Sequence, residues 1–429
     1  MSRKIFSLLD AVVIFSAFLL AYWLRFNLPI FPEKVTPPLE PYLQIAVFAA
    51  FTWVFILSIL GIYQSRLFLN FCSHLEHLLQ GSFWGMVFIM AGTALYRGFS
   101  YSRLALSFGG LLGFCWLVIL HFLVHLTLRK REKRKVIFIG EETNLTRILK
   151  RFRRQHPFLS VQVLSEFDLS ALKKRISAGP PDFVITNIAE SEMSRALQEI
   201  CEEFSIPLYV LPDFSHFLFA GKIENIDGLP LLISTQLPLE GWPARFLKRT
   251  TDLLLGNIFA LLFCLTLPFL AMAIKMNSPG PIFFTQTRVG QNRRLFRIFK
   301  FRTMKYPYVT SPPYTETNDP RVTTFGRFLR RYNLDELPQI FNVLSGEMSL
   351  VGPRPISSED IFFLRLPDFP RRLRIKPGIT GWAQVHGLRG SHTEPEERIF
   401  YDLYYIQNWS WWLDIAIIIC SFFSFKNAY

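Results

Sequence analysis

The N-terminal part of the chain consists of long apolar segments separated by short polar ones. Each segment has about the 20 residues that a helix needs to cross the hydrocarbon core of a bilayer. The third segment is the least apolar, because Gln80 and several Gly and Ser residues interrupt it. The pattern predicts four transmembrane helices, at residues 6 to 24, 42 to 63, 78 to 96 and 104 to 127.

The next part of the chain alternates short apolar stretches with amphipathic ones. The apolar stretches include VIFIG at 136 to 140, DFVITNI at 182 to 188 and IPLYVLPDF at 206 to 214. Strands that alternate with helices at this spacing are typical of a parallel, Rossmann-like sheet. Glu141 and Glu142 follow the first strand where a glycine-rich phosphate loop would lie, so the pattern favours a regulatory or scaffolding domain over a nucleotide-binding one.

A fifth apolar segment, at 253 to 273, differs from the first four. Pro268 lies inside it, and a proline removes a helical hydrogen bond and kinks the axis. Both flanks are basic, with Lys248 before the segment and Lys275 after it. We therefore expect a re-entrant helix, over about 249 to 275, that enters one leaflet, bends at Pro268 and returns to the same side.

Charge predicts the orientation of these parts. The chain is 50% hydrophobic with a formal net charge of +14, which favours contact with lipid and with phosphate-bearing ligands. With the N-terminus inside, nine Lys and Arg residues flank the four helices on the cytoplasmic side and four on the other. We expect three domains: transmembrane helices over 1 to 130, a cytoplasmic Rossmann-like domain over 131 to 240 and a mostly helical domain over 241 to 429.

The segment NLDELPQ, at 333 to 339, is the strongest candidate for chemistry. Its neighbouring carboxylates, Asp335 and Glu336, lie among many cations: Lys300, Arg302, Arg321, Arg327, Arg330, Arg331 and Arg354. Cations and a divalent metal ion neutralise phosphate oxygens in phosphoryl transfer, while a carboxylate acts as nucleophile or base. A structural alternative is equally simple, because Asn333 followed by acidic residues is how many helices begin.

From Lys248 to Phe423 the chain resembles the bacterial sugar transferase family, the monotopic polyprenyl-phosphate sugar-1-phosphate transferases. The resemblance rests on motifs that occur in the family's order: KRTTD (248 to 252), IKMNSPGPIFFTQTRVG (274 to 290), KFRTM (300 to 304), NDPRVTTFGRFLRR (318 to 331), LDELPQIFNVLSGEMSLVGPRP (334 to 355) and KPGITGWAQVHG (376 to 387). With its N-terminal helices, the whole chain is similar to the long form of the undecaprenyl-phosphate galactose and glucose phosphotransferases, which initiates O-antigen, capsule or exopolysaccharide repeat units.

The resemblance implies a two-step transfer at the inner (cytoplasmic) membrane of a bacterium, with the catalytic domain facing the cytoplasm. Asp335 would attack the sugar-bearing phosphorus of a UDP-sugar, expel UMP and pass the sugar phosphate to undecaprenyl phosphate. Glu336 would hold Mg²⁺. The cations that would bind phosphate oxygens are Arg330, Arg354, Lys300 and Arg302. Pro268 matches the break in the family's re-entrant helix, and we link His386 and the loop at 307 to 313, which depart from the pattern, to sugar choice.

Two other functions fit parts of the pattern. A membrane-anchored nucleotide-sugar dehydratase or epimerase needs a glycine fingerprint and a YxxxK pair, and no Tyr of the chain has Lys four residues later. A catalytically inactive assembly scaffold would not need Asp335, Glu336 and Arg354. We expect no nucleic-acid partner, because the basic and aromatic residues from Phe325 to Arg331 suit a helix facing lipid headgroups. A homo-oligomer is left open.

Overall fold

The computed structural model divides the chain into two compact units, Met1–Thr235 and Gln236–Tyr429. The residues that the structure describes are 3–28, 36–63, 71–96, 98–131, 135–139, 160–164, 173, 176–177, 179, 181–186, 192–204, 206–210, 222–226, 229–233, 237–306, 319–357, 369–388 and 395–423. The acidic pair that follows the first predicted strand, Glu141 and Glu142, and the proline-rich loop at 307 to 313 lie outside these residues.

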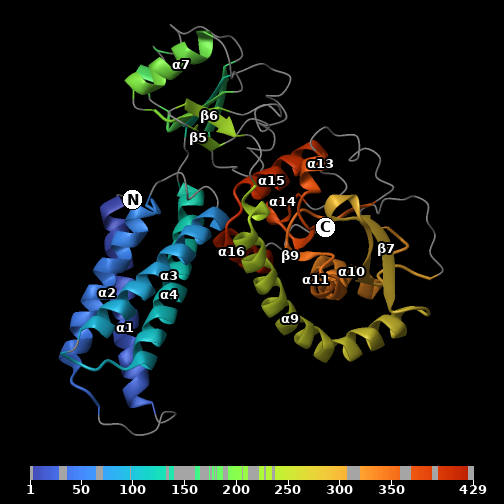
Figure 1. The fold of residues 1–429 in the computed structure, drawn as a ribbon, viewed down its shortest axis with the longest axis horizontal. Helices are drawn as coiled ribbons and strands as arrows, with labels where there is room; N and C mark the ends of the chain where they lie inside the picture. The colour runs from blue at the N-terminus through green and yellow to red at the C-terminus, as the bar shows by residue number, and fades with distance from the viewer. Residues whose placement is uncertain are drawn as a thin grey trace. The chain divides into compact units, whose positions relative to one another are not determined.

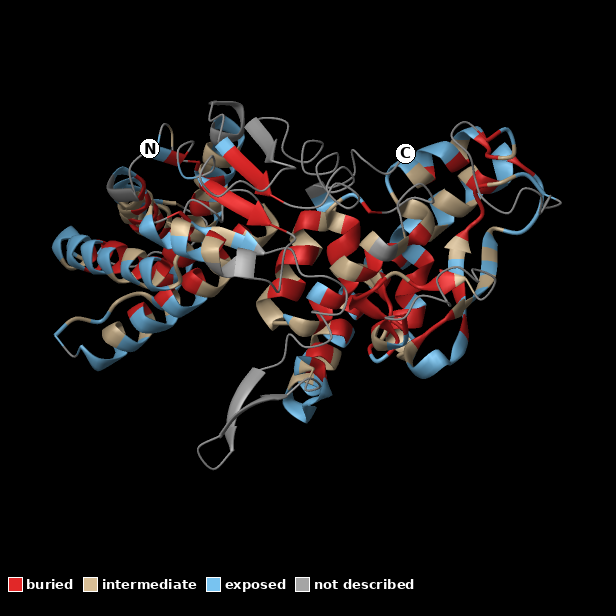
Figure 2. Cartoon of the chain, turned by 90° about the horizontal axis from the view of Figure 1, so that it is seen from above, coloured by how far each residue is buried: buried red, intermediate tan, exposed pale blue. Residues whose placement is uncertain are grey.

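Four long apolar helices occupy the N-terminal part of the first unit (Figure 1): α1 Arg3–Asn27, α2 Leu39–Ile59, α3 Phe71–Leu95 and α4 Arg103–Arg131. Each is long and apolar enough to cross a membrane. Ile14, Phe18 and Trp53 are buried between them, whereas Phe51 and Phe55 of α2 are largely exposed. Figure 2 shows exposed residues along the outer faces of these helices, where lipid would lie. The four predicted apolar helices are confirmed.

A chain of polar side chains connects three of these helices. Asp10 of α1 is fully buried, and the Tyr63 hydroxyl donates a hydrogen bond to its Oδ2 atom at 2.8 Å. His121 of α4 places Nε2 3.0 Å from Oδ1 of Asp10, and its Nδ1 lies 2.5 Å from Nε2 of His74 of α3. Such contacts satisfy polar groups that would otherwise lie bare in an apolar bundle.

A small parallel sheet lies after the helices in the first unit. Its strands are β1 Lys135–Ile139, β2 Ser160–Leu164, β3 Phe183–Thr186 and β4 Leu208–Val210, in the order β2-β1-β3-β4. Helix α7, Glu192–Glu203, connects β3 to β4 and packs Leu197 into the core of the sheet. β5 Lys222–Ile226 and β6 Leu229–Ile233 form a separate antiparallel hairpin. The parallel strands agree with the predicted alternation, and a Rossmann-like fold stays a prediction.

The second unit combines helices with small sheets. Its elements are η2 Pro238–Glu240, α9 Trp242–Asn277, β7 Phe283–Val289, η3 Gln291–Arg293, β8 Leu295–Phe301, α10 Thr324–Arg331, η4 Leu334–Gln339, α11 Ile340–Ser345, β9 Ser349–Val351, β10 Ile356–Ser357, α13 Phe369–Arg372, β11 Gly378–Thr380, α14 Trp382–Val385, α15 Pro395–Gln407 and α16 Trp411–Phe423. Strands β10, β7 and β8 form an antiparallel sheet, and β11 pairs with β9 in parallel. The unit is mostly helical, as the sequence predicts, and it also contains these small sheets.

Helix α9 continues through Pro268 and is visibly curved in Figure 1. Near its start, the Lys248 ammonium donates to Oδ2 of Asp414 on α16 at 2.7 Å. At its end, Oδ1 of Asn277 accepts the backbone N–H of Phe325 on α10 at 3.3 Å. Both ends of the helix are thus attached to the same unit.

Candidate active site

One face of the β7–β8 hairpin carries the basic side of the site. Arg288 pairs with Phe296 across the hairpin, and Gln286 pairs with Ile298. Paired residues of an antiparallel ladder share a face, and every second residue returns to it. Arg288, Ile298 and Lys300 therefore point to the same side of the hairpin, where all three line one cavity.

The acidic side of the site lies on η4, a short 3₁₀ helix. In a 3₁₀ helix the side chains at i and i+3 eclipse each other, so Glu336 and Gln339 share a face while Asp335 points elsewhere. Asn333, which precedes the helix, is left-handed with φ 54° and makes no capping hydrogen bond with its side chain. The expected structural role for the acids, a helix start capped by Asn333, is not observed.

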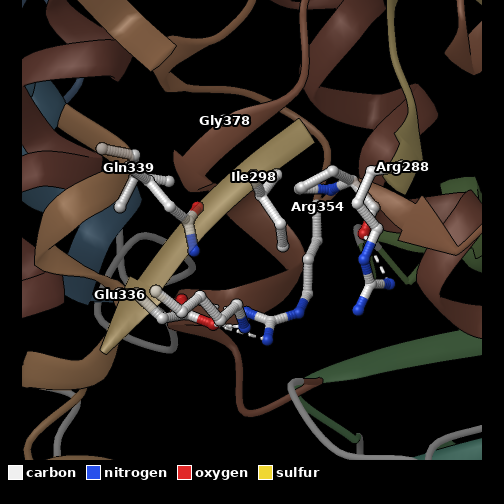
Figure 3. A pocket seen from close by; sticks show the side chains of 9 residues that line it. Arg288, Ile298, Glu336, Gln339, Arg354 and Gly378 are labelled. Carbon is white, nitrogen blue, oxygen red and sulfur yellow. Dashed lines mark hydrogen bonds and ion pairs between the residues drawn. The ribbon is translucent and has the colours of Figure 1, made fainter. Parts of the chain in front are cut away.

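Glu336 is held by two cations in an ion-pair cluster (Figure 3). Lys300 Nζ and Arg354 Nη2 each lie 2.8 Å from its Oε1 atom, and Arg354 Nη1 lies 3.3 Å from Oε2. Burial alone would raise the pKa of Glu336, but the charges of Arg354 and Lys300 outweigh it and hold the pKa well below its usual range. Glu336 therefore stays ionised and keeps both cations in place.

The pKa of Asp335 is shifted in the opposite direction from that of Glu336. Burial, together with the neighbouring charge of Glu336, raises the pKa of Asp335, against the opposing charges of Lys300, Arg330 and Arg354. No residue that the structure describes donates a hydrogen bond to its carboxylate. A carboxylate with few donors around it is a better nucleophile than one that is fully solvated or paired.

The two remaining predicted cations differ in position. Arg330 of α10 donates from Nε to Oγ1 of Thr303 at 2.8 Å, and its charge acts on Asp335. Arg302 is only 2% exposed, and its guanidinium donates to the carbonyl oxygens of Ser278 and Pro279, just past α9. The structure thus brings Lys300, Arg330 and Arg354 to the acid pair, whereas Arg302 braces the end of α9.

A small cavity lies beside Glu336. It is lined by Arg288, Ile298, Lys300, Glu336, Gln339, Arg354, Pro355, Gly378 and Ile379. Sequence reasoning missed Arg288 and Gln339. Strand alternation in TQTRV and LFRIFKF could have identified Arg288, because it has the same phase as Lys300 once the hairpin register is known.

The donor atoms suit a magnesium ion that is shared with a phosphate-bearing ligand. Among the residues that the structure describes, no three His, Cys, Asp or Glu side chains gather into a metal cluster. Mg²⁺ commonly uses only one or two carboxylates, with substrate phosphates and water as its other ligands. Glu336 would supply such a carboxylate through its Oε2 atom, whose contact with Arg354 is long at 3.3 Å.

Together, the fold and the site define a class, that of a membrane-associated enzyme built to handle phosphate groups. Residues 243–427 match the family model described as bacterial sugar transferase. A UDP-glucose:undecaprenyl-phosphate glucose-1-phosphate transferase of Escherichia coli (strain K12) is 33% identical over 68% of this chain and 68% of its own length. The chain belongs to the bacterial sugar transferase family.

Other relatives carry related names. A UDP-glucose:undecaprenyl-phosphate glucose-1-phosphate transferase of Caulobacter vibrioides is 43% identical over 49% of this chain and 84% of the relative. A UDP-N-acetylgalactosamine-undecaprenyl-phosphate N-acetylgalactosaminephosphotransferase of Aeromonas hydrophila is 35% identical over 61% of this chain and 62% of the relative. These names agree on the acceptor and differ in the sugar.

Proposed function

We propose that this enzyme transfers a sugar-1-phosphate from a UDP-sugar to undecaprenyl phosphate, and so begins a glycan repeat unit. The names of the relatives support the acceptor and the type of transfer. The observation that most supports this chemistry is that Glu336 and Asp335 have different partners and opposite pKa shifts. Glu336 is neutralised by two cations, whereas Asp335 beside it has a raised pKa and no hydrogen-bond donor among the described residues.

In the first step, an oxygen of Asp335 attacks the phosphorus that carries the sugar. A new bond forms between that oxygen and phosphorus, and the bond from phosphorus to the bridging oxygen breaks. The electron pair remains on UMP, which leaves. In the second step, a phosphate oxygen of undecaprenyl phosphate attacks the same phosphorus, and the Asp335 carboxylate is restored.

The cations around the acids supply the binding and the charge stabilisation. Lys300 and Arg354 are oriented by Glu336 before any substrate arrives, so little reorganisation is needed when phosphate oxygens approach. Arg330 would add a third positive charge near Asp335. Glu336 would hold Mg²⁺ through Oε2, and the bound ion would neutralise charge on the diphosphate.

Helix α9 supports a re-entrant arrangement. A straight helix of its 36 residues would be about 54 Å long, enough to place its two ends on opposite sides of a bilayer. Lys248, near its start, and Asn277, at its end, are instead both bonded to the same unit, and Pro268 lies between them. We therefore propose that α9 enters and leaves the membrane on the cytoplasmic side, where the catalytic unit meets UDP-sugars.

The test uses membranes that contain the full chain, with a radiolabelled UDP-sugar and undecaprenyl phosphate. Wild-type protein should move label into the lipid extract, and Asp335→Asn should abolish both this transfer and the adduct that mass spectrometry detects on the peptide around residue 335. Glu202→Gln, an exposed acid on α7, is the control and should keep full activity. Unchanged transfer by Asp335→Asn would refute Asp335 as nucleophile, and no transfer by the wild type would favour the scaffold.

A further inference from the structure

The loop that carries Arg354 has few backbone donors of its own. It lies between β9 and β10, and Pro353 and Pro355 flank the arginine. Proline has no backbone N–H, so these two residues offer only carbonyl oxygens for hydrogen bonds. The backbone N–H of Gly378 donates to the carbonyl oxygen of Pro353 at 2.9 Å. Donors from other parts of the unit therefore help to hold this loop in place.

Arg372, at the end of α13, supplies a second such donor. Its Nη2 atom donates to the backbone carbonyl oxygen of Arg354. Its Nε atom donates to Oδ2 of Asp402 on α15 at 2.6 Å, and the side chains of Arg372 and Asp402 are both only 2% exposed. One buried guanidinium thus connects α15 to the backbone of Arg354, whose side chain reaches Glu336 (Figure 3).

These contacts use the shape of the guanidinium group. Its donors lie in one plane and in fixed directions, so Asp402 sets the plane and thereby the direction from which the Arg354 carbonyl is bound. An ion pair buried in this way often adds little net stability compared with apolar side chains of the same size. Stability alone therefore does not explain why the pair is placed on the backbone of Arg354.

We propose that Arg372, oriented by Asp402, is a positioning residue that fixes Arg354 for the transfer, an inference that rests on the proposed function. Arg372 is not among the described residues that line the cavity, so it acts through Arg354 and not on the substrate. Without its contact, the carbonyl group of Arg354 is free to move, and the guanidinium moves with it. A displacement of about 1 Å near reacting atoms can cost about 100-fold in rate.

The test is a double-mutant cycle on the full-length protein in nanodiscs, with UMP release from the best donor of a UDP-sugar panel as the readout. Arg372→Lys keeps the charge but cannot hold both acceptors in one plane, so kcat/KM should fall roughly 10-fold to 100-fold. In the Arg354→Ala background, the same substitution should cost roughly twofold or less, because no guanidinium is left to position.

The cycle distinguishes positioning from a structural role, since a residue that only stabilises the unit lowers kcat/KM by the same factor in both backgrounds. Arg374→Lys is the matched control, because Arg374 lies two residues further on and pairs with Glu240. It should keep full activity. If Arg372→Lys does not fold, Asp402→Asn replaces it in the cycle, with the same expectation. Thermal unfolding of each variant gives the folded fraction to which its rate is normalised.

Equal losses in the two backgrounds would overturn the proposal, as would wild-type activity of folded Arg372→Lys or of Arg354→Ala. Failure of both Arg372→Lys and Asp402→Asn to fold would also overturn it, by assigning the ion pair to stability. In these cases the transferase function stands, because wild-type protein still releases UMP. A folded wild-type protein that releases UMP from no UDP-sugar overturns the transferase function and this inference together.

Discussion

At the scale of single residues, the site places two adjacent carboxylates in opposite states. Glu336 shares Lys300 and Arg354, which lower its pKa, and its charge in turn helps to raise the pKa of Asp335. Two titratable neighbours whose environments separate their pKa values are a common sign of divided catalytic roles. One acid organises the cations, and the other is available to react.

This separation predicts the pH dependence of the first step. Asp335 attacks only when it is deprotonated, and its pKa is raised above the ordinary aspartate value of 3.8. As the pH falls through the raised pKa, the rate of adduct formation should fall while Glu336 remains ionised. Rapid-quench mass spectrometry of the aspartyl adduct across acidic pH measures the profile. An acidic limb at or below the ordinary aspartate value would contradict the prediction.

Arg354 should be important for rate as well as for binding. Arg354→Ala removes one of the two cations on Glu336 and a donor that faces the cavity, so we expect kcat/KM to fall roughly 100-fold. The control is Arg297→Ala, which replaces an exposed arginine of the β7–β8 hairpin that pairs with Thr287. Steady-state UMP release compares the two variants, and equal rates would contradict the role of Arg354.

The limits of sequence reasoning are also visible at this scale. Asp335 and Glu336 could be singled out because they are adjacent and stand in a distinctive motif. The contact of Glu336 with Lys300, 36 residues away in the chain, depends on how β8 packs against η4. The place of Gln339 in the cavity depends on the same packing, so its local sequence could not reveal it.

At the scale of elements, Arg302 lies just past the end of strand β8, and its side chain therefore does not follow the alternation of the strand. Lys300 lies within β8 and faces the cavity, but β8 ends at Phe301, and Arg302 bonds instead to carbonyl oxygens just past α9. We expect Arg302→Ala to destabilise the unit by about 3 kcal/mol, because a buried arginine and its two bonds to carbonyl oxygens are lost. Thermal unfolding of Arg302→Ala, beside Arg297→Ala, measures this. A stable variant with weaker UDP-sugar binding would restore Arg302 to the phosphate site.

Helix α9 was predicted from its proline and its basic flanks, and the structure shows one continuous curved helix. Hydropathy alone could not distinguish a helix that crosses the membrane from one that returns to the same side. The difference depends on the contacts that hold the two ends of α9. We expect single cysteines in place of Trp242 and Met276, both exposed, to react with a membrane-impermeant reagent from the same side of sealed vesicles. Labelling from opposite sides would show a transmembrane helix.

At the scale of the whole molecule, the cavity is built from one unit only. Every described residue that lines it lies between Arg288 and Ile379, within Gln236–Tyr429. We therefore expect the membrane-bound fragment from residue 236 to 429 to release UMP from the preferred UDP-sugar within about tenfold of the full chain. UMP release by purified fragment and full chain measures this. A fragment that is folded but inactive would show that the first unit contributes to the site.

The ion pair between Lys248 and Asp414 also has a consequence for folding during synthesis, because the two residues are made at different times. The two residues are 166 positions apart in the chain, and Thr251 meets Trp411 across 160. A ribosome adds about 5–20 residues per second, so Asp414 is made on the order of ten seconds after Lys248. On the proposed re-entrant arrangement, α9 would enter the lipid during that interval with Lys248, a cation that is buried only later. The nascent enzyme can therefore close only when its last helix emerges.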